Sequence, residues 1–229
     1  MKLSVIMPVY NEESSIREII DRVKRAKIEG LTGKEIIVVN DGSTDGTGKI
    51  LENGVDGIKL ISLERNVGKG WAIREGLKQA TGDIVIIQDG DLEYNPDDYE
   101  SLIHEIIRNG NKVVYGSRIL NRDNGMSYVS FYLGGRLLSL MVNLLYNARL
   151  TDIPTCYKVF RADVLKSIGL KCRGFEFCPE VTAKLLKKGI KIRGIPIRYY
   201  PRKLSEGKKI TGWDGLKAIF VLLKYRFVN

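Results

Sequence analysis

Short apolar runs alternate with segments of helical periodicity along the first half of this 229-residue chain. The apolar runs are rich in Val and Ile, as expected for strands that are buried on both faces. In the intervening segments, apolar side chains recur every three or four positions, which indicates helices with one buried face. The expected strands are residues 3–9, 35–39, 58–63, 83–88 and 112–115, and the expected helices are residues 12–28, 44–53, 67–80 and 96–109.

Strands and helices that alternate with short links predict an α/β fold, with a mostly parallel central sheet and helices on both faces. In such sheets, ligands bind beyond the carboxyl ends of the strands. Three polar clusters follow expected strands at that edge, namely residues 10–12, 41–43 and 89–93. We therefore expect these clusters to converge on one crevice.

The third cluster is the most acidic of the three. Asp89, Asp91 and Glu93 occupy alternate positions, so their side chains point the same way if the backbone stays extended. Carboxylates this close together repel one another unless a cation offsets their charge. An all-oxygen cluster suits Mg²⁺ or Mn²⁺ better than zinc. A polar turn without a metal is the alternative, because Asp, Gly and Asn are common turn residues.

The second half of the chain has a different pattern. Residues 128–150 predict one or two amphipathic helices that lie on a membrane or in a groove, and a buried core helix is the alternative. Residues 157–161 and 190–199 are typical of strands, residues 179–188 of a helix, and residues 213–227 of a final amphipathic helix. We find no run of 18 apolar residues and therefore expect no membrane-spanning helix.

The positive charge of the protein belongs to its second half. Residues 1–100 hold 13 Lys and Arg against 19 Asp and Glu, whereas residues 101–229 hold 24 against 8. This asymmetry favours phosphate-bearing partners or an anionic membrane for the second half. No DNA-binding or RNA-binding module is visible.

Few residues point to disulfide, zinc or histidine chemistry. The three cysteines show no C-x-x-C spacing, which argues against disulfides and zinc, and the first residues run into a strand rather than a signal peptide. The single histidine, His104, falls within a helical pattern, where a position on the helix face is expected. We therefore expect a cytoplasmic protein.

Five segments resemble the family 2 glycosyltransferases: VIMPVYNEESSI, IIVVNDGSTDGT, NVGKGWAIREGL, GDIVIIQDGDLEYNPDDY and VVYGSR. Later segments, GGRLLSLMVNLLYN, DIPTCYKVFR and PRKLSEGKKI, are similar to the dolichyl- or polyprenyl-phosphate mannose and glucose synthases. The resemblance implies a GT-A fold in a single domain over residues 1–229. Residues 1–118 would form its nucleotide-sugar-binding half, and residues 119–229 its acceptor- and membrane-facing half.

The resemblance also implies roles for individual residues. The nucleotide-binding positions would be Pro8, Tyr10, Glu12, Asp41, Lys69, Asp89 and Gly90. The metal ligands would be Asp89, Asp91 and Glu93, and the catalytic positions Asp89, Asp91, Arg118 and Arg136. Phosphate or acceptor contacts would come from Arg118, Arg136, Ser139, Arg202, Lys208 and Lys209.

The implied reaction is metal-dependent, inverting transfer of a hexose from UDP or GDP to a polyprenyl or dolichyl phosphate, at the cytoplasmic face of the membrane. A lipid phosphate is already an anionic nucleophile, so it needs positioning more than a general base. A sugar or lipid hydroxyl acceptor would need a base, for which Asp152, Glu176 and Glu180 are candidates. The non-enzyme alternative is a nucleotide-sugar-binding subunit without turnover. Residues 156–158 read Cys-Tyr-Lys where a mannose synthase would carry Gly-Phe-Lys or Gly-Phe-Arg, so the nucleotide base and the sugar stay open.

Overall fold

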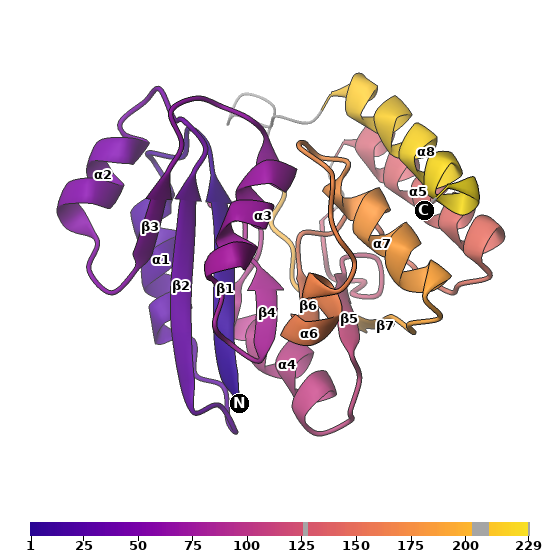
Figure 1. Ribbon diagram of the computed structural model, residues 1–229, viewed down its shortest axis with the longest axis horizontal. Coiled ribbons are helices and arrows are strands. Elements are labelled where there is room, and N and C mark those ends of the chain that lie inside the picture. Colours follow the sequence, from indigo (N-terminus) through magenta and orange to yellow (C-terminus); the bar gives the residue numbers. More distant parts are fainter. Residues whose placement is uncertain (126–127, 203–210, 229) are drawn as a thin grey trace.

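The computed structural model describes residues 1–125, 128–202 and 211–228. Within this part of the chain, seven strands form one sheet in the order β3-β2-β1-β4-β6-β5-β7 (Figure 1). The strands are β1 (Lys2–Val9), β2 (Gly33–Asn40), β3 (Lys59–Ser62), β4 (Ile84–Ile87), β5 (Val113–Ser117), β6 (Lys158–Arg161) and β7 (Arg193–Pro196). The helices are α1 (Ile16–Arg25), α2 (Thr47–Gly54), α3 (Lys69–Gln79), α4 (Tyr99–Ile107), α5 (Val129–Tyr146), α6 (Ala162–Lys166), α7 (Phe177–Lys187) and α8 (Gly212–Phe227).

The sheet is parallel except at β6, which runs antiparallel to both of its neighbours, β4 and β5. The amino end of β6 therefore lies at the same edge as the carboxyl ends of the other strands. In the register, Val159 pairs with Ile86 and Lys158 pairs with Tyr115. The loop that precedes β6 consequently lies beside the segments that follow β4 and β5, and this arrangement places the site described below.

The predicted α/β fold is confirmed, and most expected elements are present with shorter bounds. The helix expected over residues 44–53 begins only at Thr47, because Ser43 and Thr44 bind the neighbouring loop instead of capping a helix. The amide of Asn11 donates to the Ser43 hydroxyl, and the amide of Thr44 donates to the Asn11 side chain. Of the strand expected over residues 190–199, only β7 forms.

Helices cover both faces of the sheet, with α3 and α7 on the near side in Figure 1 and α1 and α4 on the far side. The core between them consists mainly of Val and Ile side chains, and α1 contributes four fully buried residues, Ile16, Ile19, Ile20 and Val23. At about 1.5–3 kcal/mol for each large apolar side chain removed from water, this burial is the main stabilising contribution to the fold.

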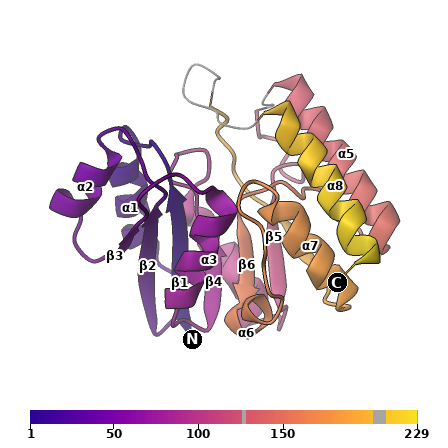
Figure 2. The ribbon, with the colours of Figure 1, turned by 45° about the horizontal axis from the view of Figure 1, so that its top comes forward.

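A second, smaller hydrophobic cluster joins α5, α7 and α8. In Figures 1 and 2, α5 and α8 lie side by side at the edge of the molecule that is farthest from α2. Only Ser139 and Val142 of α5 are buried, so α5 is a single amphipathic helix and the core-helix alternative is wrong. By length and mean hydropathy (1.3 over 18 residues), α5 is long and apolar enough to cross a membrane. The sequence-based expectation that no helix would meet these two criteria was therefore too strict.

Candidate active site

A cavity of about 1130 Å³ opens at the carboxyl edge of the sheet. It is large for a small-molecule site, which is commonly about 300–1,000 Å³. Its walls come from the segments that follow β1, β2, β4 and β5, from the loop before β6, and from α5 and α8. The three polar clusters expected to converge do so here, because residues of each line the cavity: Tyr10, Glu12, Asp41, Asp89, Asp91 and Glu93.

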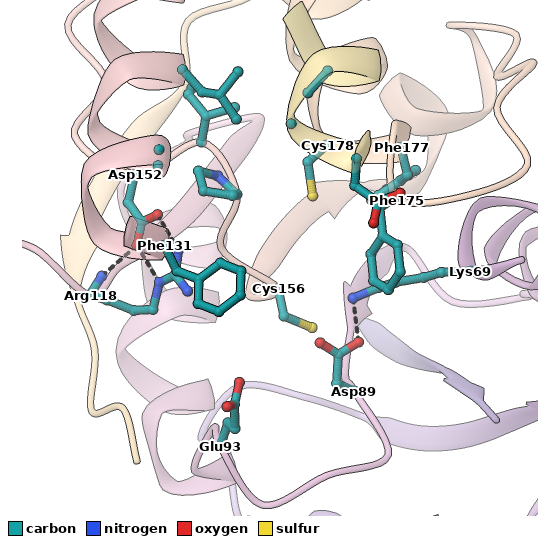
Figure 3. A pocket seen from close by; sticks show the side chains of 18 of the residues that line it. Lys69, Asp89, Glu93, Arg118, Phe131, Asp152, Cys156, Phe175, Phe177 and Cys178 are labelled. Carbon is teal, nitrogen blue, oxygen red and sulfur yellow. Dashed lines mark hydrogen bonds and ion pairs between the residues drawn. The ribbon is translucent and has the colours of Figure 1, made fainter. Parts of the chain in front are cut away.

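Asp89 pairs with Lys69, the first residue of α3. The Lys69 ammonium lies 2.5 Å from a carboxylate oxygen of Asp89, and the two side chains point toward each other at one side of the cavity (Figure 3). Burial alone would raise the pKa of Asp89, but the charge of Lys69 holds it below its ordinary value. Lys69 is thus an ion-pair partner of the acid cluster, and not only a solvated residue at a helix start.

Asp91 and Glu12 share a different cation, Arg202. The Arg202 guanidinium donates to Glu12 at 2.8 and 3.2 Å and to Asp91 at 2.8 Å. The backbone amide of Arg202 donates to Glu93, which also accepts a hydrogen bond from the Tyr199 hydroxyl. Burial and the nearby charge of Asp89 nevertheless raise the pKa of Asp91 to about 7, although Arg202 opposes the rise. Negative charge therefore remains in excess at this edge of the sheet.

The extended backbone on which the expected common orientation of the three acids depended is not found, because β4 ends at Ile87 and the chain bends before Glu93. In the part of the chain that the structure describes, the carboxylate oxygens of Asp89, Asp91 and Glu93 do not all lie within 4.8 Å of one another. Their donor set still fits a hard divalent ion, since it holds only carboxylate oxygens and its charge is incompletely offset.

Asp41 lies just after β2, on the wall of the cavity that the segments after β1 and β2 form. Its two carboxylate oxygens accept the backbone amides of Val67 and Gly68, each at 2.8 Å, and so fix the turn that leads into α3. Gly68 has φ +116°, and a Cβ there would lie 2.5 Å from the carbonyl oxygen of Arg173. Only glycine fits this turn, which places Lys69 at the cavity. Pro8, Tyr10 and Gly90 also line this side.

Arg118 follows β5 and forms a two-pronged ion pair with Asp152, from the loop before β6 (Figure 3). Both N···O distances are 2.7 Å. Arg136 of α5 also lines the cavity and has no ion-pair partner among the described residues. We call the part of the cavity lined by these two arginines its basic end, although Asp152 offsets the charge of Arg118.

Ser139 does not reach the cavity. Its hydroxyl donates to the Gly135 carbonyl and accepts the Ile153 amide, so it ties α5 to the loop before β6. With an exposed fraction of 4%, it is part of the packing and not an acceptor contact, which corrects the sequence-based expectation. Lys208 and Lys209 lie outside the described residues.

The three candidate bases all have structural partners. Asp152 is bound by Arg118, and Glu176 accepts the amides of Arg173 and Gly174. Glu180 is 1% exposed and accepts the amides of Lys171 and Cys172, the Lys184 ammonium and the Tyr225 hydroxyl. Asp152 and Glu180 would therefore lose such contacts on taking a proton. Both amides bind the same oxygen of Glu176, Oε1, so its other oxygen, Oε2, is not engaged by them, and Glu176 lines the cavity.

Sequence reasoning missed the apolar and thiol lining of the cavity. Phe131, Cys156, Phe175, Phe177 and Cys178 surround the space between Lys69 and Arg118 (Figure 3). They come from the start of α5, the loop before β6 and the start of α7. The only signal in the sequence was the position of Cys156 just ahead of an expected strand. This position indicates a place in the cavity only if the strand is antiparallel, because its amino end then lies at the cavity edge of the sheet.

Comparison with known proteins agrees with this geometry. The profile of the family described as Glycosyl transferase family 2 matches residues 4–169. A dodecaprenyl-phosphate galacturonate synthase of Rhizobium johnstonii is 31% identical over 78% of this chain and 53% of its own length. A dolichol-phosphate mannosyltransferase of Pyrococcus furiosus is 29% identical over 98% of this chain and 64% of its own length. The chain thus spans between about half and two thirds of these relatives.

The fold also matches a solved glycosyltransferase structure. The glucosyl-3-phosphoglycerate synthase of Mycobacterium tuberculosis, crystallised with Mn²⁺, uridine diphosphate and phosphoglyceric acid, superposes with a TM-score of 0.75 at 20% identity. The superposition covers 100% of this chain and 79% of that one, and it confirms the GT-A-like fold. Taken with the profile match over most of the sheet, these similarities establish that the chain belongs to glycosyl transferase family 2.

Proposed function

We propose that this chain transfers a hexose from a UDP- or GDP-linked donor to a polyprenyl or dolichyl phosphate, with inversion and with the help of Mg²⁺ or Mn²⁺. One observation carries the proposal: a single cavity joins the acid cluster at Asp89 to the basic end at Arg118 and Arg136 and continues between α5 and α8. The names of the two relatives support it, since both refer to a polyprenyl-type lipid phosphate.

The donor half of the proposal rests on the strand ends. Pro8, Tyr10 and Asp41 would border the nucleoside, and Lys69 would contact the diphosphate. Asp89, Asp91 and Glu93 would hold the divalent ion, which when bound supplies positive charge to the departing diphosphate. Lys69 and Arg202 would add to that charge from the protein side, because both already lie against the acids.

The acceptor half rests on the basic end of the cavity. Arg118 and Arg136 would hold the lipid phosphate with one oxygen directed at the anomeric carbon. That oxygen forms the new C–O bond while the bond to the diphosphate breaks, and its electron pair leaves with the nucleoside diphosphate. No proton moves in this step, so the structural engagement of Asp152 and Glu180, two of the three candidate bases, favours a phosphate over a hydroxyl acceptor.

The lipid chain of the acceptor would reach the cavity from a membrane that the outer face of α5 and α8 contacts. Exposed large apolar side chains lie along both helices: Val129, Leu133, Leu137, Leu140, Leu144, Trp213, Leu216, Phe220 and Phe227. Contiguous apolar surface of this kind marks an interaction site. We propose that it rests on the cytoplasmic leaflet as a peripheral contact, since α5 already packs against α7 and α8 through its buried side.

Steady-state kinetics with both substrates tests the acceptor assignment. Arg136→Ala is expected to raise the KM for a short polyprenyl phosphate about tenfold, the cost of one lost charge-assisted hydrogen bond, and to change the KM for the donor much less. Arg108→Ala, a surface arginine paired with Glu29, is the matched control and should leave both values unchanged. Equal effects of Arg136→Ala on both substrates would remove Arg136 from the acceptor site.

A further inference from the structure

The pair formed by Asp152 and Arg118 uses every oxygen of the carboxylate. One oxygen of Asp152 accepts both the backbone amide and the Nε–H of Arg118, at 2.9 and 2.7 Å. The other accepts Nη2–H at 2.7 Å. The carboxylate thus holds both the backbone of Arg118 and the inner edge of its guanidinium.

This side-on contact determines which edge of the guanidinium remains available. Of the five N–H groups, Asp152 takes one on Nε and one on Nη2, which leaves three on the Nη1 and Nη2 edge. Tyr199 also contacts this guanidinium, with its ring 5.1 Å from the guanidinium carbon and its hydroxyl in a hydrogen bond with Arg118, so it limits the tilt of the group and shares part of the remaining edge. Arg118 therefore presents one fixed edge, and an edge of this geometry matches two phosphate oxygens.

The loop that carries Asp152 is itself held in place. The fully buried ammonium of Lys158 donates to the Ile153 and Thr155 carbonyls. The Thr151 hydroxyl lies 2.7 Å from that of Ser117, which ties the loop to the end of β5. Burial alone would raise the pKa of Asp152, but the charge and hydrogen bonds of Arg118 hold it below its ordinary value, so Asp152 stays ionised.

We infer that Asp152 is a positioning residue, which orients Arg118 toward the acceptor phosphate and takes no proton itself. The inference rests on the proposed function and deepens it, since it assigns a role to a carboxylate that would otherwise be the leading candidate for a general base. A base would act on the acceptor directly, whereas a positioning residue acts only through Arg118. The two roles therefore differ in how the effects of substitutions combine.

A double-mutant cycle on Asp152→Asn and Arg118→Gln separates these roles. We expect Asp152→Asn alone to lower kcat at least about tenfold, because a displaced guanidinium no longer meets the phosphate. In the Arg118→Gln background, the same change should lower kcat less than about twofold. Full multiplicative loss in the double variant would overturn the inference and restore Asp152 as a base, and an unchanged kcat in Asp152→Asn would overturn it as well.

Two controls keep the test independent of folding and of the proposed reaction. Asp163→Asn removes a surface carboxylate paired with Arg161 and should change nothing, while the UDP or GDP affinity of each variant with Mn²⁺ reports an intact donor side. The wild-type product assay tests the proposed function by itself. The same cycle measured on the Kd of farnesyl phosphate needs no turnover, and the effect of Asp152→Asn should again vanish without Arg118.

Discussion

The guanidinium of Arg202 lies 2.8 Å from the Asp91 carboxylate, although 111 residues separate them in the sequence. The same guanidinium binds Glu12, so one side-chain cation bridges Asp91 of the proposed metal site and Glu12 of the neighbouring loop. An arginine in this place can offset the acids before substrate binds and contact the diphosphate afterwards. Metal binding and Arg202 would then compete for Asp91.

Removal of Arg202 is therefore expected to strengthen the binding of the metal ion and to weaken the binding of the donor. Arg202→Ala should raise the affinity for Mn²⁺ without nucleotide about fivefold, which corresponds to about 1 kcal/mol for a partly exposed ion pair. It should also raise the KM for the donor. Calorimetric Mn²⁺ titration and donor kinetics check the two effects. Arg198→Ala, which breaks a pair with Asp98 outside the cavity, is the control, and weaker Mn²⁺ binding by Arg202→Ala would contradict competition.

Lys69 offers a second test of the donor side. Lys69→Gln removes the ammonium 2.5 Å from Asp89, so the pKa of Asp89 should rise and one contact to the diphosphate should be lost. We expect kcat/KM for the donor to fall about 10–100-fold. Lys78→Gln, on the same helix but paired with Glu75 at the surface, should keep full activity. Comparable losses in both variants would show that the effect comes from α3 itself.

The apolar face of α5 and α8 gives a prediction about membranes. Leu140 and Phe220 are 55% and 66% exposed, and their replacement by Gln should weaken binding to anionic liposomes at least about tenfold. Flotation with and without added salt measures this, and the basic second half should make binding salt-sensitive. Leu120→Gln, which changes an apolar residue that is 45% exposed and lies outside α5 and α8, serves as control. If the variant with both replacements still binds liposomes as the wild type does, the proposed role of this face in membrane contact is contradicted.

Stability at low pH should depend on Glu35, at the edge of the sheet opposite the cavity. Burial alone would raise its pKa, but hydrogen bonds from Ser4, Thr81 and Lys2 lower it to about 2 from 4.5. A depressed folded-state pKa stabilises the protein above pH 4.5, and this stabilisation is lost as the pH falls toward 2. We expect it to be about 1–2 kcal/mol after allowance for solvent screening.

Glu35→Gln tests this by denaturant unfolding between pH 2 and 7. The variant should be less stable than the wild type at pH 7, and the difference should close on acidification. Glu18→Gln, which removes an exposed carboxylate of an i,i+4 pair, should keep the wild-type pH dependence. An equal stability gap at pH 7 and pH 2 would refute the assigned role of Glu35.

The sequence predicted the parallel half of the sheet and its polar strand ends, because those features are local. Apolar runs locate β1, β2 and β4. Because these strands are parallel, the residues that follow them lie at one edge of the sheet, where the cavity opens. The direction of β6 is not a local property. Without it, Asp152 could only be named as one of three candidate bases, whereas its position beside Arg118 follows from an antiparallel strand inserted between β4 and β5.

Long-range ion pairs were the other feature that sequence patterns could not give. Arg202 was expected to contact a diphosphate, and its contact with Asp91 depends on how the segment after β7 crosses the acid cluster. Ser139 was misassigned for a related reason. A hydroxyl on an amphipathic helix can point either into a ligand site or into the protein interior, and here the hydrogen bond from the Ile153 amide shows that Ser139 points into the interior.

The central claim is the identity of the product, and mass spectrometry of the lipid fraction tests it most directly. The protein would be incubated with Mg²⁺ or Mn²⁺, a short polyprenyl phosphate, and in turn UDP-glucose, UDP-GlcNAc, UDP-galactose and GDP-mannose. The account predicts one glycosyl-phosphate lipid and an equal amount of nucleoside diphosphate, both abolished by Asp91→Ala. Donor binding without any glycosyl-phosphate lipid from this panel would contradict it, and would point to a hydroxyl acceptor or to a binding subunit without turnover.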